Sequence, residues 1–469
     1  MKIRHHEIAS NTENPFAECK LGREPYAKVL TDIVNTYADG FVLAINNVWG
    51  TGKTTFVKMW QQHLKNEGFQ TIYFNAWEND FDDNPMVAIM SELKTLVKIE
   101  NEDFFNNIIK KGAIIGKKVL PVVMKSLLKK IAGIKTDEIT EALADGTSEV
   151  LSSEIDEYIN RKQTVSEFRT ELEEFIRKTE NEKPLIFFVD ELDRCRPDYA
   201  VEVLEHVKHF FSVHGIVFVL SIDKKHLASS VKGFYGSDLI DSNEYLRRFI
   251  DLEYSIPAPQ INVFNEYLYE YYDFNNFFSS KERKEIPAFQ NDAEFLLKIA
   301  NILFIKTDAT LRQQERIFAL TRLILCSVKS DQHIFPDLLF VLVYLQTMQN
   351  DIFQKIERNE FTLQELSNTF FEIINSEKKT SDDFSMLYIE SLLLWFYNND
   401  RNNQDKINLL EKDESNNMIT SIKSKLESEN DRLSLVQYFE HIAQQRSYSN
   451  LGLKYLIKKI NLTESIKIQ

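Results

Sequence analysis

Short, continuous apolar runs recur through the first half of the chain, and each run ends in polar residues. They span residues 41–45, 71–74, 185–189 and 216–220. Runs of this length are typical of parallel strands that are buried on both faces of a sheet. Segments with apolar residues at helical spacing separate the runs. The pattern therefore predicts an α/β fold in which a parallel sheet is flanked by helices.

The pattern changes from about Pro257 onward, where helical spacing replaces the alternation of strands and helices. We therefore expect a first domain over residues 1–260 and an all-α region over residues 261–469. The second region is interpreted as a helical lid followed by a C-terminal helical domain. Within the first domain, residues 101–180 are predicted to form a helical, lysine-rich insertion between the two motifs described below.

The turn after the first apolar run carries a glycine-containing phosphate-binding motif. Glycines let backbone N–H groups face a phosphate, and the following helix points its positive dipole end at the same anion. Lys53 is predicted to reach the β- and γ-phosphates, and the Thr54 hydroxyl to bind Mg²⁺. Asn47 replaces the usual first glycine, and we expect the loop to close because Asn tolerates a left-handed backbone. The predicted nucleotide-binding residues of this loop are Asn47, Trp49, Gly50, Thr51, Gly52, Lys53, Thr54 and Thr55.

A second motif follows the third apolar run, which ends in an adjacent pair of acidic residues. Asp190 is the candidate metal ligand beside Thr54, and Glu191 is placed to polarise the attacking water as general base. The fourth run ends in Ser221 and Asp223, which are the candidates for a polar sensor beside the γ-phosphate. A cap at the end of the strand is the alternative interpretation of both residues.

Three arginines are candidates for contact with the nucleotide. Arg247 and Arg248 are adjacent in a predicted helix. Arg248 is the candidate arginine finger, which would stabilise the charge that develops on the phosphate in the transition state, either in its own subunit or across an interface. A surface ion pair is the alternative for these arginines. Arg312 follows a predicted helix start at Thr310. In a lid domain, an arginine at such a position can contact the γ-phosphate, so Arg312 is a candidate for this contact. Arg23 precedes the first helix, which in many NTPases covers the base and ribose; an ordinary surface turn is the alternative. The predicted catalytic residues are therefore Lys53, Glu191, Asp223 and Arg248.

The overall charge speaks against a general nucleic-acid binder. The chain has 71 acidic and 56 basic residues, which gives a net charge of −15. Its three cysteines show neither metal-ligand spacing nor a disulfide framework. The N-terminal stretch lacks the apolar core of an export signal. A cytoplasmic protein fits these features.

Residues 104–136 have an unusual composition, with eight lysines and no acidic residue. The lysines alternate with apolar clusters, and the uncharged runs are far shorter than the roughly 20 residues of a spanning helix. The pattern favours a cationic amphipathic element over residues 108–135, which contacts an anionic membrane surface on the cytoplasmic side or an acidic partner. A solvated helix packed on this acidic protein is the alternative.

Together, the motifs resemble those of the KAP family of P-loop NTPases. This resemblance implies an ASCE-type sheet, ATP and Mg²⁺ as cofactors, ATPase activity, and a homo-oligomer or a partner protein. The family includes a plasmid phage-exclusion protein, so the implied context is bacterial phage defence or membrane-associated signalling. Many members insert transmembrane helices where this chain has its lysine-rich segment, but the sequence contains no such span. The matching stretches are LGR (21–23), VWGTGKTT (48–55), FNAW (74–77), VDELDRCRP (189–197), SID (221–223), YLRRFIDLEYSIP (245–257) and TLRQQER (310–316).

Several functions agree with these motifs. The favoured one is a nucleotide-dependent switch that hydrolyses ATP slowly. A small-molecule or nucleoside kinase is an alternative, although the adjacent carboxylates suit activation of water better than phosphoryl transfer to a hydroxyl group. A non-catalytic, nucleotide-bound scaffold is another alternative, favoured by Asn47. A nucleic-acid motor ranks last, because neither the charge nor an aromatic–basic pattern supports it.

Overall fold

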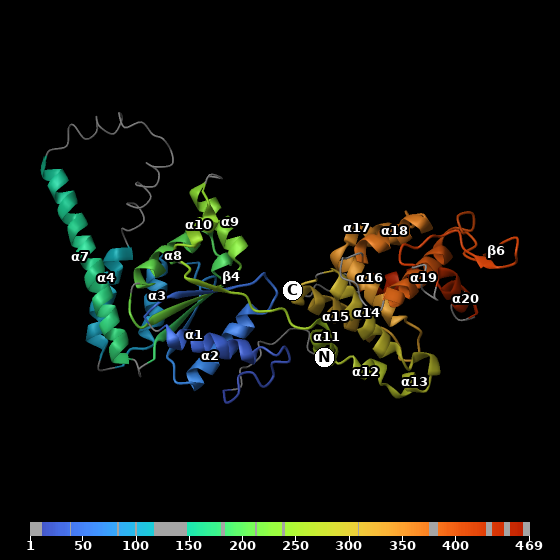
Figure 1. Ribbon diagram of the computed structural model, residues 1–469, viewed down its shortest axis with the longest axis horizontal. Coiled ribbons are helices and arrows are strands. Elements are labelled where there is room, and N and C mark those ends of the chain that lie inside the picture. Colours follow the sequence, from blue (N-terminus) through green and yellow to red (C-terminus); the bar gives the residue numbers. More distant parts are fainter. Residues whose placement is uncertain are drawn as a thin grey trace. The chain divides into compact units, whose positions relative to one another are not determined.

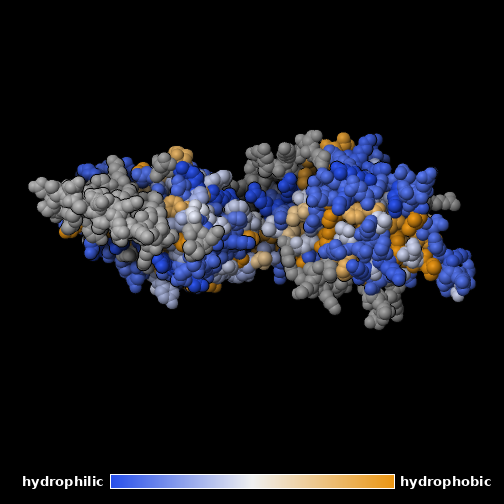
Figure 2. All heavy atoms as spheres, turned by 90° about the horizontal axis from the view of Figure 1, so that it is seen from above, coloured by the Kyte–Doolittle hydropathy of each residue, from blue (hydrophilic) through white to orange (hydrophobic). Residues whose placement is uncertain are grey.

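The computed structural model divides into two compact units, Glu7–Ala258 and a second unit that starts at Pro259 (Figure 1). It describes residues 12–462 except 38, 82–83, 99–100, 117–147, 180–182, 212, 237–239, 308, 375–382, 428–433 and 445–450. The face shown in Figure 2 is mainly hydrophilic, and its apolar side chains form separate patches.

The first unit is built on a five-stranded parallel sheet with the strand order β2-β3-β4-β1-β5. Strand β4 therefore lies between β1 and β3, which is the arrangement of an ASCE-type P-loop NTPase. The predicted fold class is confirmed. Strand β5 was not predicted, because it has only three residues and two of them are exposed. The strands are β1 (Val42–Asn46), β2 (Thr71–Asn75), β3 (Leu185–Asp190), β4 (Ile216–Ile222) and β5 (Leu252–Tyr254).

Helices cover both faces of this sheet (Figure 1). Alternate residues of β1 enter different cores, with Leu43 packed on one side and Val42 and Ala44 on the other. This double burial explains why the strands are continuous apolar runs. One face carries α1 (Glu24–Thr36) and α2 (Lys53–Asn66). The other carries α3 (Pro85–Lys94), α4 (Glu102–Gly116), α7 (Ser148–Thr179), α8 (Pro197–Phe211), α9 (Lys224–Tyr235) and α10 (Ser242–Leu246).

Helices α4 and α7 lie side by side at one end of the unit (Figure 1). Phe105 of α4 is buried, and its ring centre lies 5.0 Å from that of Phe175 of α7, with the two rings tilted by 43°. Lys111 forms ion pairs of 2.8 Å with both Glu167 and Glu171. The beginning of the lysine-rich segment therefore packs on the protein itself, as its alternative interpretation expects. Residues 117–135 of the predicted membrane-contacting element lie outside the described residues.

No helix in the described part of the chain is long and apolar enough to cross a membrane.

The second unit is a helical assembly around a central apolar helix, α16, whose residues from Pro336 to Leu345 are all buried. The unit departs from the all-α prediction in one place. There, β6 (Glu411–Lys412) and β7 (Met418–Ile419) form a short antiparallel ribbon. The helices are α11 (Ile261–Tyr271), α12 (Asn275–Phe278), α13 (Lys281–Lys284), α14 (Asp292–Thr307), α15 (Leu311–Cys326), α16 (Pro336–Met348), α17 (Asn350–Glu357), α18 (Leu363–Ile374), α19 (Asp383–Asp400), α20 (Leu435–Gln444) and α21 (Leu453–Asn461).

Candidate functional site

The candidate site lies at the carboxyl edge of the sheet, where β1 leads through a tight turn into α2. Gly50 and Gly52 have φ angles of 80° and 77°, in the left-handed region that favours glycine. Gly52 is the N-cap of α2, which begins at Lys53. The two glycines therefore have the backbone role that the motif predicts.

Asn47 has a different role from the one expected. It is not among the described residues with positive φ, so the explanation from left-handed backbone is wrong. Instead, its side-chain amide donates to the Ile256 carbonyl at 2.9 Å and accepts from the Ile256 N–H at 2.8 Å. Its own N–H donates to the Ile222 carbonyl at 3.2 Å. Asn47 therefore anchors the loop to the last residue of β4 and to the chain that follows β5.

The Lys53 ammonium lies inside the loop, where it donates to the Asn47 carbonyl at 2.6 Å. Burial lowers the pKa of Lys53, and the charges of Asp193, Asp223 and Asp190 oppose this effect. The P-loop lysine and the acidic residues that follow β3 and β4 are therefore close enough to interact electrostatically.

Arg23 is buried, with only 3% of its surface exposed, so the alternative of an ordinary surface turn is wrong. Its guanidinium donates to the Thr51 carbonyl at 2.6 Å and to the Gly52 carbonyl at 3.0 Å. These contacts hold the P-loop backbone from the side of α1. Direct contact between Arg23 and a nucleotide stays a prediction.

Asp190, the last residue of β3, and Glu191, which follows it, lie in different environments. The buried Asp190 accepts from the Tyr73 hydroxyl at 2.8 Å and from the Glu191 N–H at 2.9 Å. Glu191 has a left-handed backbone, with φ at 60°, and its carboxylate pairs with Arg194 at 2.7 Å. The Asn75 amide donates to the other Glu191 oxygen at 3.5 Å. Burial raises the pKa of Glu191, and the Arg194 charge opposes the rise.

The donor set at this edge fits Mg²⁺. A carboxylate offers about four lone-pair positions, so the two bonds to Asp190 leave acceptor capacity for a metal or its water. Mg²⁺ usually takes one or two protein oxygens and fills its shell with water and phosphate. The described residues contain no cluster of three or more His, Cys, Asp or Glu that forms a metal site of their own. Asp190 and Thr54 are the residues that would hold the ion.

The sensor candidates lie at the end of β4. Ser221 pairs in register with Asp190 of β3 and Ile45 of β1, and its buried hydroxyl has no hydrogen-bond partner within the described part of the chain. Asp223 caps α9 by accepting from the N–H groups of Lys225 at 3.1 Å and His226 at 3.4 Å. The capping role is therefore present, and a sensor role for Asp223 or Ser221 stays a prediction.

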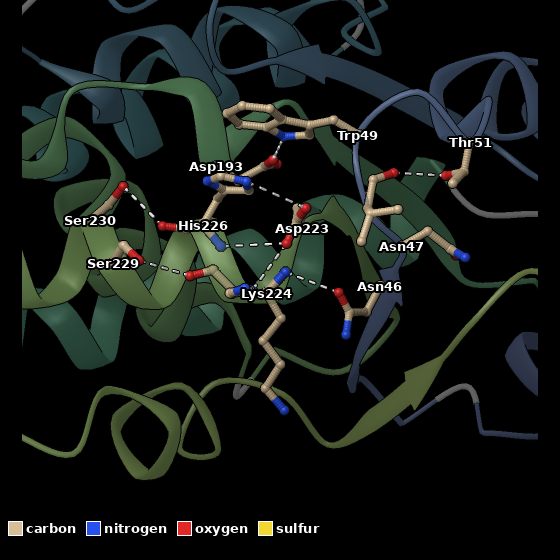
Figure 3. Close-up of polar contacts among 12 residues, drawn as sticks. Asn46, Asn47, Trp49, Thr51, Asp193, Asp223, Lys224, His226, Ser229 and Ser230 are labelled. Carbon is tan, nitrogen blue, oxygen red and sulfur yellow. Dashed lines mark hydrogen bonds and ion pairs between the residues drawn. The ribbon is translucent and has the colours of Figure 1, made fainter. Parts of the chain in front are cut away.

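Trp49 joins the P-loop to two other elements of the site (Figure 3). Its indole N–H donates to the Asp193 carboxylate, and its ring stacks on His226 at 3.9 Å with an angle of 6°. His226 also lies 3.9 Å from Asp223. Sequence reasoning missed His226 and Tyr73, since neither belongs to a motif and both reach the site only through the fold.

The other candidate arginines, Arg247, Arg248 and Arg312, are exposed. Arg247 and Arg248 lie in the turn after α10, so the prediction that they are part of a helix is wrong. Arg247 pairs with Glu244 at 3.0 Å, whereas the side chain of Arg248 has no hydrogen bond or ion pair among the described residues. Arg312 lies in α15 of the second unit, which begins with a capping box at Thr310. Catalytic or phosphate contacts of Arg248 and Arg312 stay predictions.

The match to a protein-family model agrees with this geometry. The model of the KAP family P-loop domain matches residues 23–373. Comparison with curated proteins gave no match. Among solved structures, C. elegans PCH-2 is 11% identical with a TM-score of 0.29, covering 72% of this chain and 70% of that chain. The Aeropyrum pernix ORC2 protein in ADPNP–ADP complexes is 13% identical with a TM-score of 0.34, covering 95% of each chain. A DNA replication initiation factor is 12% identical with a TM-score of 0.30, covering 97% and 96%.

The strand order and the P-loop define a P-loop NTPase of the ASCE type. Because the family model spans most of its length, the chain belongs to the KAP family. The fold and the family establish a nucleotide-binding class of protein.

Proposed function

We propose that this protein binds ATP with Mg²⁺ and hydrolyses it slowly, as a nucleotide-dependent switch. The observation that carries the proposal is the convergence of the half-buried Lys53 ammonium, inside the P-loop, with acidic residues at the ends of β3 and β4. Glu191 follows Asp190 at the same edge, where burial raises the pKa of its carboxyl above the ordinary value, and a carboxylate in this position can act as a general base. Such a pairing of cation and carboxylates suits phosphate binding together with activation of water.

Each residue has a separate task in this proposal. Backbone N–H groups of the loop and Lys53 bind the phosphates, while Thr54 and Asp190 hold the metal. Bound Mg²⁺ supplies charge neutralisation at the phosphate oxygens. Glu191 orients the attacking water and accepts its proton. Arg23 and Asn47 keep the loop in place through their backbone contacts.

Phosphate release by purified protein tests the proposal. Lys53→Ala and Glu191→Gln are each expected to abolish ATP turnover, the first by loss of binding and the second by loss of the base. Lys65→Ala and Glu67→Gln are matched controls, because both residues are exposed at the far end of α2. Turnover like that of the unmodified chain in both site variants would refute the ATPase assignment.

A non-catalytic scaffold is the second candidate, and one observation favours it. Both Glu191 oxygens are engaged, by Arg194 and by Asn75, which restricts their access to water. Tight calorimetric binding of ATP without phosphate release would support the scaffold. ADP formation that requires an added hydroxyl acceptor would instead support the small-molecule or nucleoside kinase.

The biological setting that we propose is a cytoplasmic switch in phage defence or membrane-associated signalling, as in PifA-like members of the family. It acts as a homo-oligomer or with a partner protein, and its net charge of −15 makes nucleic acid an unfavourable partner. The lysines of 108–135 would contact anionic lipid. Co-sedimentation with anionic vesicles that fails with neutral vesicles and weakens at raised salt is the expected result. Equal binding to both vesicles would refute electrostatic membrane contact.

A further inference from the structure

Arg194 contacts the proposed general base, Glu191, and two tryptophan rings of the site. Its guanidinium pairs with the Glu191 carboxylate at 2.7 Å. The guanidinium carbon lies 6.0 Å from the centre of the Trp49 ring and 5.6 Å from that of Trp77. Both distances are within the range of cation–π attraction. The arginine therefore contacts an indole of the P-loop and an indole beyond the end of β2 while it engages the carboxylate.

The local backbone explains why this arginine reaches the base. Glu191 has a left-handed conformation and is followed by a single 3₁₀ turn, Leu192–Arg194. This turn brings the side chain three residues after Glu191 back onto its carboxylate. The Glu191 side chain is only 14% exposed, so the pair is screened less than an ion pair at an open surface.

The two tryptophans are themselves held by residues of the site. The Trp49 indole is bonded to Asp193 and stacked on His226. The backbone N–H of Trp77 donates to Asn75 Oδ1 at 3.1 Å, while the Nδ2 of the same amide points to Glu191. The Asn75 side chain thus links Trp77 to the base. The position of the Arg194 side chain therefore depends on the conformation of the P-loop and of the segment that follows β2.

We propose that Arg194 is a positioning residue that restrains Glu191, and that Trp49 makes this restraint depend on the conformation of the P-loop. The proposal deepens the ATPase function above and rests on it. A carboxylate oxygen that accepts a charged hydrogen bond is less available to water. A phosphate chain on the P-loop is a second anion that competes for the guanidinium, and movement of Trp49 removes one of its aromatic contacts. Release of Arg194 then frees Glu191.

The kinetic test compares Arg194→Gln with the unmodified chain. Because the restraint is lost, kcat for ATP hydrolysis is expected to rise about three- to thirtyfold, with little change in KM. Arg194→Lys should restore most of the slow rate, since it keeps the positive charge. Trp77→Leu should raise kcat less, because it removes a single contact. Arg177→Gln is the control, since Arg177 is exposed on α7. A kcat at or below that of the unmodified chain in Arg194→Gln would overturn the proposal.

A second measurement is independent of turnover. Emission from Trp77 is isolated as the difference between the chain and its Trp77→Phe variant. It is recorded immediately after mixing with ATP, before the slow hydrolysis proceeds, so that Glu191 and its ion pair with Arg194 are kept. ATP is expected to change this emission when Arg194 is present and to leave it unchanged in Arg194→Gln. An unmodified chain without any ATPase activity refutes the proposed function. The role of Arg194 is refuted if ATP changes the emission equally in the proteins with Arg194 and with Arg194→Gln, or if ATP changes it in neither protein.

Discussion

The side chain of Asn47 forms two hydrogen bonds with the backbone of Ile256, which lies 209 residues later in the chain. The side-chain N–H of Asn47 donates to the carbonyl of Ile256, and the side-chain oxygen of Asn47 accepts from the N–H of the same residue. A neighbouring β-strand would pair with Ile256 in the same way. A glycine at this position, as in the usual motif, provides neither bond. Asn47 is therefore a structural anchor for the P-loop.

Asn47→Gly is expected to lower the free energy of unfolding by about 1–3 kcal/mol, because the N–H and the carbonyl of Ile256 both lose their partner. It should not raise ATP turnover. Urea denaturation and phosphate release measure the two effects. Ser255→Ala is the control, since it removes only one exposed hydrogen bond to the carbonyl of Asn46. A more stable or faster Asn47→Gly protein would contradict the anchoring role.

Arg23→Met is expected to reduce affinity for ATP at least about tenfold and to lower the free energy of unfolding by about 1.5–3 kcal/mol. The physical reason is the loss of two charge-assisted bonds to the carbonyls of Thr51 and Gly52. Calorimetry and denaturation provide the measurements. Arg23→Lys should give an intermediate result, because one ammonium group cannot reproduce the planar fork. Unchanged affinity in Arg23→Met would show that the loop keeps its shape without these bonds.

Gly52→Ala and Gly68→Ala form a matched pair of variants. Both glycines have positive φ, +77° and +83°, so each alanine pays about 1–2 kcal/mol of backbone strain. A Cβ at Gly52 would also lie 3.0 Å from Arg23 Nη1, whereas a Cβ at Gly68 meets nothing within 4 Å. Gly52→Ala should therefore lower the free energy of unfolding more than Gly68→Ala does, as measured by urea denaturation, and it should also weaken ATP binding. Equal losses would mean that the guanidinium moves aside without cost.

Arg248→Ala tests action across a subunit interface. If Arg248 is a finger for a neighbouring site, its loss should lower kcat on the order of 10³-fold. Mixing Arg248→Ala with Glu191→Gln protein should restore part of the activity, because one mixed interface has both residues. Arg247→Ala is the control, since that guanidinium pairs with Glu244. Mixtures without any recovery would rule out a shared site.

Glu390 is a buried acid in the second unit, and its carboxylate accepts from the hydroxyls of Ser367 at 2.6 Å and Ser424 at 2.5 Å. Burial raises its pKa to about 7. The folded state therefore holds this proton more tightly than the unfolded state does. Below the unfolded pKa both states are protonated, and between that value and about 7 the unfolded state ionises first.

Stability should consequently fall as pH rises from about 4.5 to about 7, by roughly 2–3 kcal/mol from this group, and level off above. Glu390→Gln should remove this part of the pH dependence. Denaturation at several pH values gives the comparison, with the exposed Glu414→Gln as control. An unchanged pH profile in Glu390→Gln would show that the carboxylate ionises without cost in the folded protein.

The sequence by itself determined the strands and the motifs, because both are local patterns. Four buried strands were evident as apolar runs, and their polar ends located Lys53, Asp190 and Glu191 at the same edge of a sheet. The capping box at Thr310 is likewise a local signal that the structure contains. The short β5 has no such signal, since two of its three residues are exposed.

Only the tertiary structure decided which side chains support these motifs. Tyr73 reaches Asp190 across 117 residues of sequence, and Arg23 reaches the P-loop across 28 or 29. The role of Asn47 follows from a hydrogen-bonded partner far along the chain, and not from its own backbone preference. A motif specifies the groups that meet a ligand, whereas the residues that hold those groups are chosen by packing between distant segments. For that reason the restraint of Glu191 by Arg194 became visible only in three dimensions.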